Sequence, residues 1–255
     1  MVRLPISGIE VDLRSPAGAD DLLLCEALSV DVRLGVELAR RVARLATGGE
    51  VDWAELPIAD LDFLLLRVRQ TQVGDLIRAE AVCPVSDCAK PVDVSFRVSG
   101  YLAYHRPVRP HGVTDVADGW YHASNVDAEF RAPRASDLIM AAETGNPAAF
   151  LVTRCMRPSD AGPRVRRRVE RLVSLMAPSL AEDLAARCAE CGSSIRLRFD
   201  PLDYVLRELR GQALGIHDDV HILASAYHWR EADILALPRS RRAMYVEMVM
   251  EASGA

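Results

Sequence analysis

Apolar and polar residues alternate in two short segments of the chain, residues 9–13 and residues 126–130. This period of two predicts a half-buried β-strand in each place. Pro16 follows the first segment and Pro133 follows the second, and an acidic residue or a serine then precedes an apolar run, as at the start of a helix. Each strand is therefore expected to lead directly into a helix.

The two segments read as copies of one unit. Residues 7–16 are SGIEVDLRSP and residues 124–133 are SNVDAEFRAP, so that a serine, an arginine and a proline coincide. Gly8 in the first copy matches Asn125 in the second, and both residue types tolerate the positive φ of a hairpin turn. The repeat predicts two similar lobes, or one domain made from both copies.

Each copy then runs through helical sequence into a pair of cysteines and a further strand. The helical stretches are residues 59–77 and residues 166–186, the second with a break at Pro178. The predicted fold class is α+β, an internally duplicated strand–helix–helix–cysteine pair–strand unit with a helical C-terminal extension. The predicted domains are residues 1–100 (first lobe), 101–119 (connector), 120–200 (second lobe) and 201–255 (helical extension).

The cysteine pairs suggest a metal site. Two thiolates a few residues apart can bind one ion from a tight turn, and four thiolates complete a tetrahedral zinc site. The lobes could share one structural Zn²⁺, or each pair could lie apart and merely pack or oxidise. A thioredoxin-like redox role is disfavoured because a strand, not a helix, follows the second pair. The predicted ligands are Cys83, Cys88, Cys188 and Cys191, whereas Cys25 and Cys155 lie in apolar helical contexts and are expected in the core.

Composition narrows the classes of function. The formal net charge is −5 and only 5% of residues are aromatic, so nucleic-acid binding is not favoured. The arginines of residues 164–171 fit a solvated or protein-binding helix face, and a zinc-ribbon-type nucleic-acid-binding or regulatory protein is the alternative. No catalytic motif is present, and His217 and His221 are read as one solvated helix face. A non-enzymatic, cytoplasmic protein without a membrane span is expected, with its cysteines in a reducing compartment.

Three segments resemble baseplate-associated and hub assembly proteins of contractile phage tails, including those of T-even phages, and of bacterial extracellular contractile injection systems. They begin at Arg14 (RSPAGADDL), at Cys188 (CAECG, with FDPLDY following) and at Val220 (VHILASAYHWREADILALP). The last of them is also similar to a helical motif of phage tail assembly chaperones. The resemblance covers most of the chain in its order of segments, and the cysteine pairs vary among such proteins.

The resemblance implies a baseplate component or assembly factor that is made in the cytoplasm and binds baseplate, tube or spike proteins. It carries no catalytic residues. It leaves open whether the chain is a permanent subunit of a released particle or a transient chaperone. Aromatic and aliphatic residues of the C-terminal segment are the predicted partner-binding anchors, namely Tyr227, Trp229, Ile234, Leu235 and Leu237.

Overall fold

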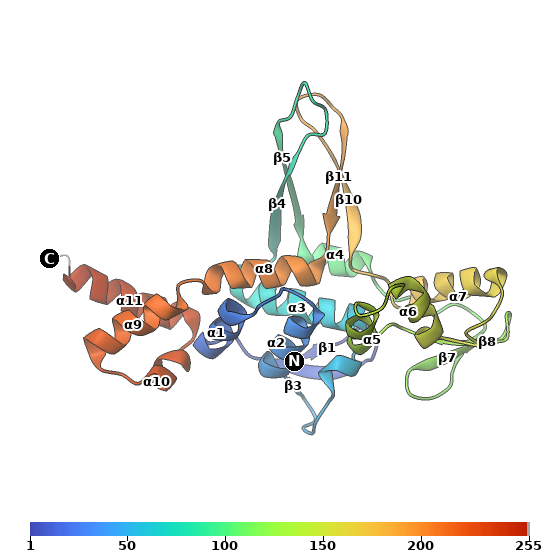
Figure 1. The fold of residues 1–255 in the computed structure, drawn as a ribbon, viewed down its shortest axis with the longest axis horizontal. Helices are drawn as coiled ribbons and strands as arrows, with labels where there is room; N and C mark the ends of the chain where they lie inside the picture. The colour runs from blue at the N-terminus through green and yellow to red at the C-terminus, as the bar shows by residue number, and fades with distance from the viewer. Residues whose placement is uncertain (254–255) are drawn as a thin grey trace.

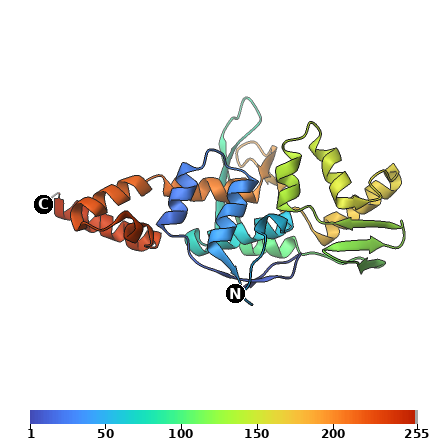
Figure 2. The same cartoon turned by 60° about the horizontal axis from the view of Figure 1, so that its bottom comes forward.

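The fold is mixed α+β, as predicted, and the computed structural model describes residues 1–253 of the chain. Helices and small antiparallel sheets form an elongated body, and two β-hairpins stand side by side on it (Figure 1). The C-terminal helices lie at one end of the body and the largest sheet lies at the other, which Figure 2 shows from a second direction.

The first unit of the fold comprises a three-stranded antiparallel sheet, helices and the first hairpin. The start of the helix at residues 32–42 is fixed by its own sequence, because the Asp31 side chain accepts a hydrogen bond from the Leu34 N–H there. The elements of this first unit are β1 (Val2–Arg3), β2 (Glu10–Leu13), α1 (Gly18–Glu26), α2 (Val32–Val42), β3 (Ala43–Leu45), the 3-10 turn η1 (Trp53–Glu55), α3 (Ile58–Val73), β4 (Leu76–Val82), β5 (Pro91–Arg97) and α4 (Val98–Tyr104).

The second unit has the same order of elements from β8 onward: a strand, two helices, a strand, a longer helix, a hairpin and a helix. Three C-terminal helices follow it. The elements are β6 (Val113–Asp115), β7 (Trp120–Ala123), β8 (Ala128–Arg131), α5 (Ala135–Ala141), α6 (Pro147–Cys155), β9 (Met156–Arg157), α7 (Pro163–Met176), β10 (Glu182–Arg187), β11 (Ser194–Phe199) and α8 (Pro201–Ala213), then α9 (Ile216–Tyr227), α10 (Glu231–Leu235) and α11 (Arg239–Ser253).

The same ion pair joins strand and helix in both units. Arg14 donates two hydrogen bonds to Asp20, at 2.6 and 2.9 Å, and Arg131 donates two to Asp137 at the same distances. Each aspartate also accepts a backbone N–H at the start of its helix, so that it caps the helix while it holds the arginine. These contacts support the predicted repeat, although a duplication of the chain stays an interpretation.

A Leu-Pro segment docks on the first helix of each unit. The segment before α3 reaches the second unit, where the Ala135 N–H donates to the Leu56 carbonyl at 2.9 Å. The segment before α11 reaches the first unit, where the Gly18 N–H donates to the Leu237 carbonyl at 3.3 Å. The two docking contacts correspond, and they tie distant parts of the chain together.

Three apolar clusters form the interior. The main core lies among β1–β3, α1–α4 and α8, so that a helix of the second unit completes the core of the first. A smaller cluster lies between the β6–β9 sheet and α7, and a third lies between the hairpins. At the hairpin bases the rings of Phe96 and Phe199 meet edge to face, with centroids 5.0 Å apart. Each of these phenylalanines precedes the helix that leaves its hairpin.

The helical predictions are wrong at the ends that approach the cysteines. Residues 59–77 read as largely helical sequence, but α3 stops before Gly74, whose φ is 94°, and β4 begins at Leu76. Residues 182–186 were expected in a helix and belong to β10, which pairs with β11. A strand precedes as well as follows each cysteine pair, since the facing strand supplies its backbone hydrogen bonds.

Three further details differ from the expected pattern. Gly8 has the predicted positive φ, which is 71°. In the turn between β7 and β8, however, Asp127 and not Asn125 takes this conformation, with a φ of 47°. The stretch 101–119, expected to be a connector, contains the end of α4 and the strand β6. The extension predicted from residue 201 contains α8, which packs in the main core, so that only α9–α11 are set apart from it. No helix within residues 1–253 has the length and hydropathy needed to cross a bilayer.

We predict that Asp137→Ala lowers the stability of the chain by about 3 kcal/mol, because it leaves the buried Arg131 guanidinium without its partner. Burial acts to raise the pKa of Asp137, but hydrogen bonds from Arg131 and Arg134 outweigh it and lower the pKa. The stabilisation is therefore present above the unfolded-state pKa of about 3.9 and is lost as the pH falls through the lower folded-state value.

Urea unfolding at several pH values measures this effect. The matched control is Asp233→Ala, which breaks an exposed pair with Arg230 and should leave the unfolding midpoint unchanged. Equal effects of the two substitutions would contradict the assignment of Asp137 as a structural pair.

Candidate metal centre

The two cysteine pairs lie in the turns of the two hairpins. Val82 pairs with Pro91 at the end of the first ladder, and Arg187 pairs with Ser194 at the end of the second. The cysteines follow immediately, and both Figure 1 and the sulfur distances place the two turns next to each other. The turns thus meet at the tips of hairpins from different units.

The four sulfur atoms form one compact group. The Sγ atoms of Cys83 and Cys191 are 3.5 Å apart, and those of Cys88 and Cys188 are 3.7 Å apart. All four lie within 4.8 Å of one another. A tetrahedral ion with metal–sulfur bonds of ~2.3 Å requires sulfurs ~3.8 Å apart, whereas a disulfide requires ~2.0 Å. The spacing therefore fits a single ion bound by all four thiolates.

Both turns have the same local geometry after the second cysteine. Ala89 follows Cys88 with a φ of 43°, and Gly192 follows Cys191 with a φ of 72°. This left-handed residue reverses the chain, and glycine adopts it without strain whereas alanine does not. Backbone hydrogen bonds from the second residue beyond the cysteine reach the sulfurs of Cys83, Cys88 and Cys191. Such bonds stabilise thiolate ligands.

The surroundings move the thiol pKa values of Cys83 and Cys191 in opposite directions. A backbone hydrogen bond from Val85 lowers the pKa of Cys83, but burial and the neighbouring sulfurs raise it to about 12. Hydrogen bonds from Ser193 lower the pKa of Cys191 to about 6. Four adjacent thiolates repel one another unless a cation lies between them, and a divalent ion would release their protons.

The cluster could hold a metal ion, and its chemistry there would be structural. Four protein ligands fill a tetrahedral ion and leave no position for water or substrate. Cys83 and Cys188 are buried, while Cys191 is exposed. Beneath the sulfurs only Val92 and Ile195 add buried apolar side chains to the third cluster. At their tips the hairpins are therefore joined mainly by the sulfur group.

The remaining candidate residues lie elsewhere. Within residues 1–253 no second group of cysteine, histidine or carboxylate side chains has metal-binding geometry. Cys155 is buried as predicted, and burial raises its pKa to about 11, while Cys25 is only partly buried. His217 and His221 are exposed on α9. None of these side chains adds to the sulfur cluster.

The predicted partner-binding residues divide into two groups. Ile234 is fully buried, and Leu235 and Leu237 are partly buried where α10 and the following turn meet α1. Tyr227 and Trp229 stay more than a third exposed and stack with ring centroids 4.9 Å apart. The first group holds the C-terminal helices on the body, and the second lies open.

The sequence reasoning overlooked the exposed methionines of α11. Met244 and Met248 are 50% and 52% exposed and lie one helical turn apart on α11, the helix whose Tyr245 contacts the Tyr227–Trp229 stack. Apolar and charged residues are mixed around α11, so that no single apolar stripe marks its buried side. No pattern in the sequence therefore singled out these methionines as exposed.

Comparison with known proteins finds no counterpart: no family model, no curated protein and no solved structure matches the chain.

We predict one tetrahedrally coordinated metal ion per chain. Cys83→Ser and Cys188→Ser should each abolish binding, since each removes a ligand from a different hairpin. Elemental analysis of protein purified under reducing conditions gives the stoichiometry. Cys25→Ser, outside the cluster, is the matched control and should retain the ion. Metal retained in either ligand variant, or absent from fresh wild-type protein, would contradict a shared site.

Proposed function

We propose that the protein is a non-catalytic baseplate component or assembly factor of a phage tail-like contractile injection system, acting by protein–protein binding. The observation that carries the proposal is the closed four-cysteine cluster between two units, which supports a scaffold more than an enzyme. The sequence resemblance supplies the type of machine. Assembly in the cytoplasm belongs to the same proposal.

Zinc is the ion that we propose for the cluster. Thiolate ligands and tetrahedral spacing favour zinc or an iron–sulfur centre over harder ions, and the short contacts of 3.5 and 3.7 Å suit one ion. The ion would fix the hairpin tips and therefore the relation between the two units. It would leave the ends of the body free for partners.

The exposed face of the C-terminal helices supports a partner surface. Tyr227 and Trp229 provide flat rings, and Met244 and Met248 provide exposed, flexible thioether side chains on α11, whose Tyr245 contacts both rings. Aromatic residues often dominate interfaces, and methionines adapt to irregular partner surfaces. Baseplate, tube or spike proteins are the proposed partners of this face.

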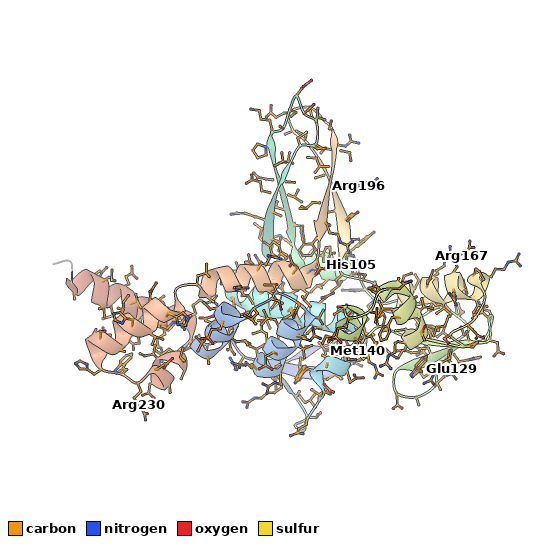
Figure 3. The ribbon with its side chains drawn as sticks, viewed as in Figure 1. His105, Glu129, Met140, Arg167, Arg196 and Arg230 are labelled. Atoms are coloured by element: carbon orange, nitrogen blue, oxygen red, sulfur yellow. The ribbon has the colours of Figure 1, made fainter. Side chains whose placement is uncertain are left out.

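The double substitution Met244→Glu with Met248→Glu should prevent incorporation into sheathed particles, because it places charge on the proposed contact surface. Sedimentation and immunodetection of particles from cells carrying the system measure incorporation. Met140→Glu is the matched control, since Met140 is an exposed methionine on α5 of the second unit and lies outside the C-terminal helices (Figure 3).

The point variants test the surface more cleanly than removal of residues 220–255. That deletion would strip the buried Asp21 carboxylate of Arg239 and Arg242, its partners on α11, and would destabilise the body itself. Normal particles formed with the double methionine variant would exclude this surface. A source genome without sheath, tube and spike genes would exclude the injection-system role.

A nucleic-acid-binding or regulatory role is the second candidate, and the outer face of α7 favours it. Arg164, Arg167 and Arg171 are exposed, and none of them pairs with a carboxylate within the described part of the chain. Arg167 points away from the body in Figure 3. This candidate predicts salt-dependent DNA or RNA binding that Arg167→Glu weakens. Absence of binding at low salt would remove it.

A further inference from the structure

The helix α8 occupies a groove of the first unit formed by α1, α2 and α3. Its apolar face is fully buried there, and the Leu202 side chain lies beside Gly35 and Leu65. Glu208 of α8 also receives two hydrogen bonds from the buried Arg69 of α3. The groove of the first unit is thus filled by an amphipathic helix that comes from the second unit.

The helix α4 corresponds to α8, because each follows a hairpin and carries a tyrosine five residues after the phenylalanine. Each tyrosine reaches across to the other unit: Tyr101 donates to the Leu180 carbonyl at 2.6 Å, and Tyr204 donates to the Arg78 carbonyl at 3.2 Å. By this correspondence α4 points toward the groove of the second unit. It ends at Tyr104, however, before the extended chain around Pro107.

The groove of the second unit is consequently left open. A cavity of about 390 Å³ with an almost entirely apolar wall lies among α5, α6 and α7. The lining side chains that carry the argument are Leu138, Leu151, Val152, Cys155, Val169 and Val173.

The strand registers show that the α6 wall of this cavity corresponds to a part of α2 that is buried in the main core. Leu13 pairs with Ala43 in the first sheet, and the corresponding Phe130 pairs with Met156 in the second. Counting back from these partners, the cavity-lining side chains of α6 take the places of three residues of α2 that are buried in the main core, namely Leu38, Ala39 and Val42.

The long helices give the same correspondence. Counted from the first residue of each helix, Val169 and Val173 of α7 take the places of Leu64 and Val68 of α3. Glu170 takes the place of Leu65, the residue beside Leu202 of α8. The apolar residues at these places are therefore kept, and charges are introduced at two positions, Glu170 and Arg166, the latter at the place of Leu61.

We propose that this second-unit groove binds one amphipathic α-helix of a partner protein, with its apolar stripe inward and a basic residue opposite Glu170. The way in which α8 fills the corresponding groove argues for a helix, and Glu170 and Arg166, which form no ion pair within residues 1–253, argue for complementary charges on it. This surface is distinct from the exposed face of α11, and the proposal does not depend on the injection-system role.

A peptide derived from α8 is the probe. It comprises residues 200–214 with Leu202→Lys, so that the lysine faces Glu170. Fluorescence anisotropy with the full-length, metal-loaded chain should show saturable binding, about fivefold tighter than that of the unmodified peptide. Val173→Asp in the protein should abolish binding. Glu170→Lys should reverse the preference, so that a peptide with Leu202→Glu binds better than the lysine peptide.

Arg164→Glu, on the face of α7 opposite Val173, is the matched control and should leave the affinity unchanged; circular dichroism and metal content verify the fold of every variant. No saturable binding up to about 1 mM peptide would overturn the proposal. Binding that is indifferent to Val173→Asp and to the Glu170 charge reversal would also overturn it. A concentration-dependent dimer of the chain that Val173→Asp disrupts would assign the groove to a second copy and overturn the partner helix.

Discussion

Four sulfur atoms at the hairpin tips connect two parts of the molecule that share few other contacts there. A two-stranded hairpin is marginally stable by itself, and neither hairpin has more than a few apolar side chains to bury. Each close sulfur contact joins one unit to the other, Cys83 to Cys191 and Cys88 to Cys188. An ion at this point would therefore be held only when both hairpins are in place, which couples metal binding to the arrangement of the units.

Away from the hairpins, a Leu-Pro segment from a distant part of the chain docks on the first helix of each unit. Side-chain chemistry distinguishes these two docking contacts. The Leu-Pro segment before α11 brings Arg239 and Arg242 onto the buried carboxylate of Asp21. At the corresponding place in the second unit Leu138 and Ile58 line one apolar cavity. Docking either segment on the other helix would bury a charge without a partner, which is costly. The same kind of backbone hydrogen bond forms at both docking contacts. The side chains therefore determine which Leu-Pro segment docks on which helix.

Local patterns in the sequence predicted those strands and turns whose structure depends on residues close together in the chain. Alternation predicted β2 and β8, and the cysteine spacing predicted the ligands that lie together in the structure. The strands before the cysteines were missed, because β4 and β10 follow helical sequence closely and their partners lie beyond the turns. The docking of α8 was missed for a related reason, since its apolar stripe shows that it is covered but not by which helices.

The asymmetry between the units explains where binding surfaces can remain. In the first unit α8 fills the groove and the Leu-Pro segment before α11 covers α1, so that its interior is complete within the chain. The helix α4, which corresponds to α8 in the order of elements, ends at Tyr104, and in the second unit apolar side chains such as Val152 and Val173 line a cavity. Two units with the same order of elements but unequal covering thus place one buried core beside one open groove. The cysteine cluster lies on the hairpins between them, where a bound ion would hold the units without occupying either surface.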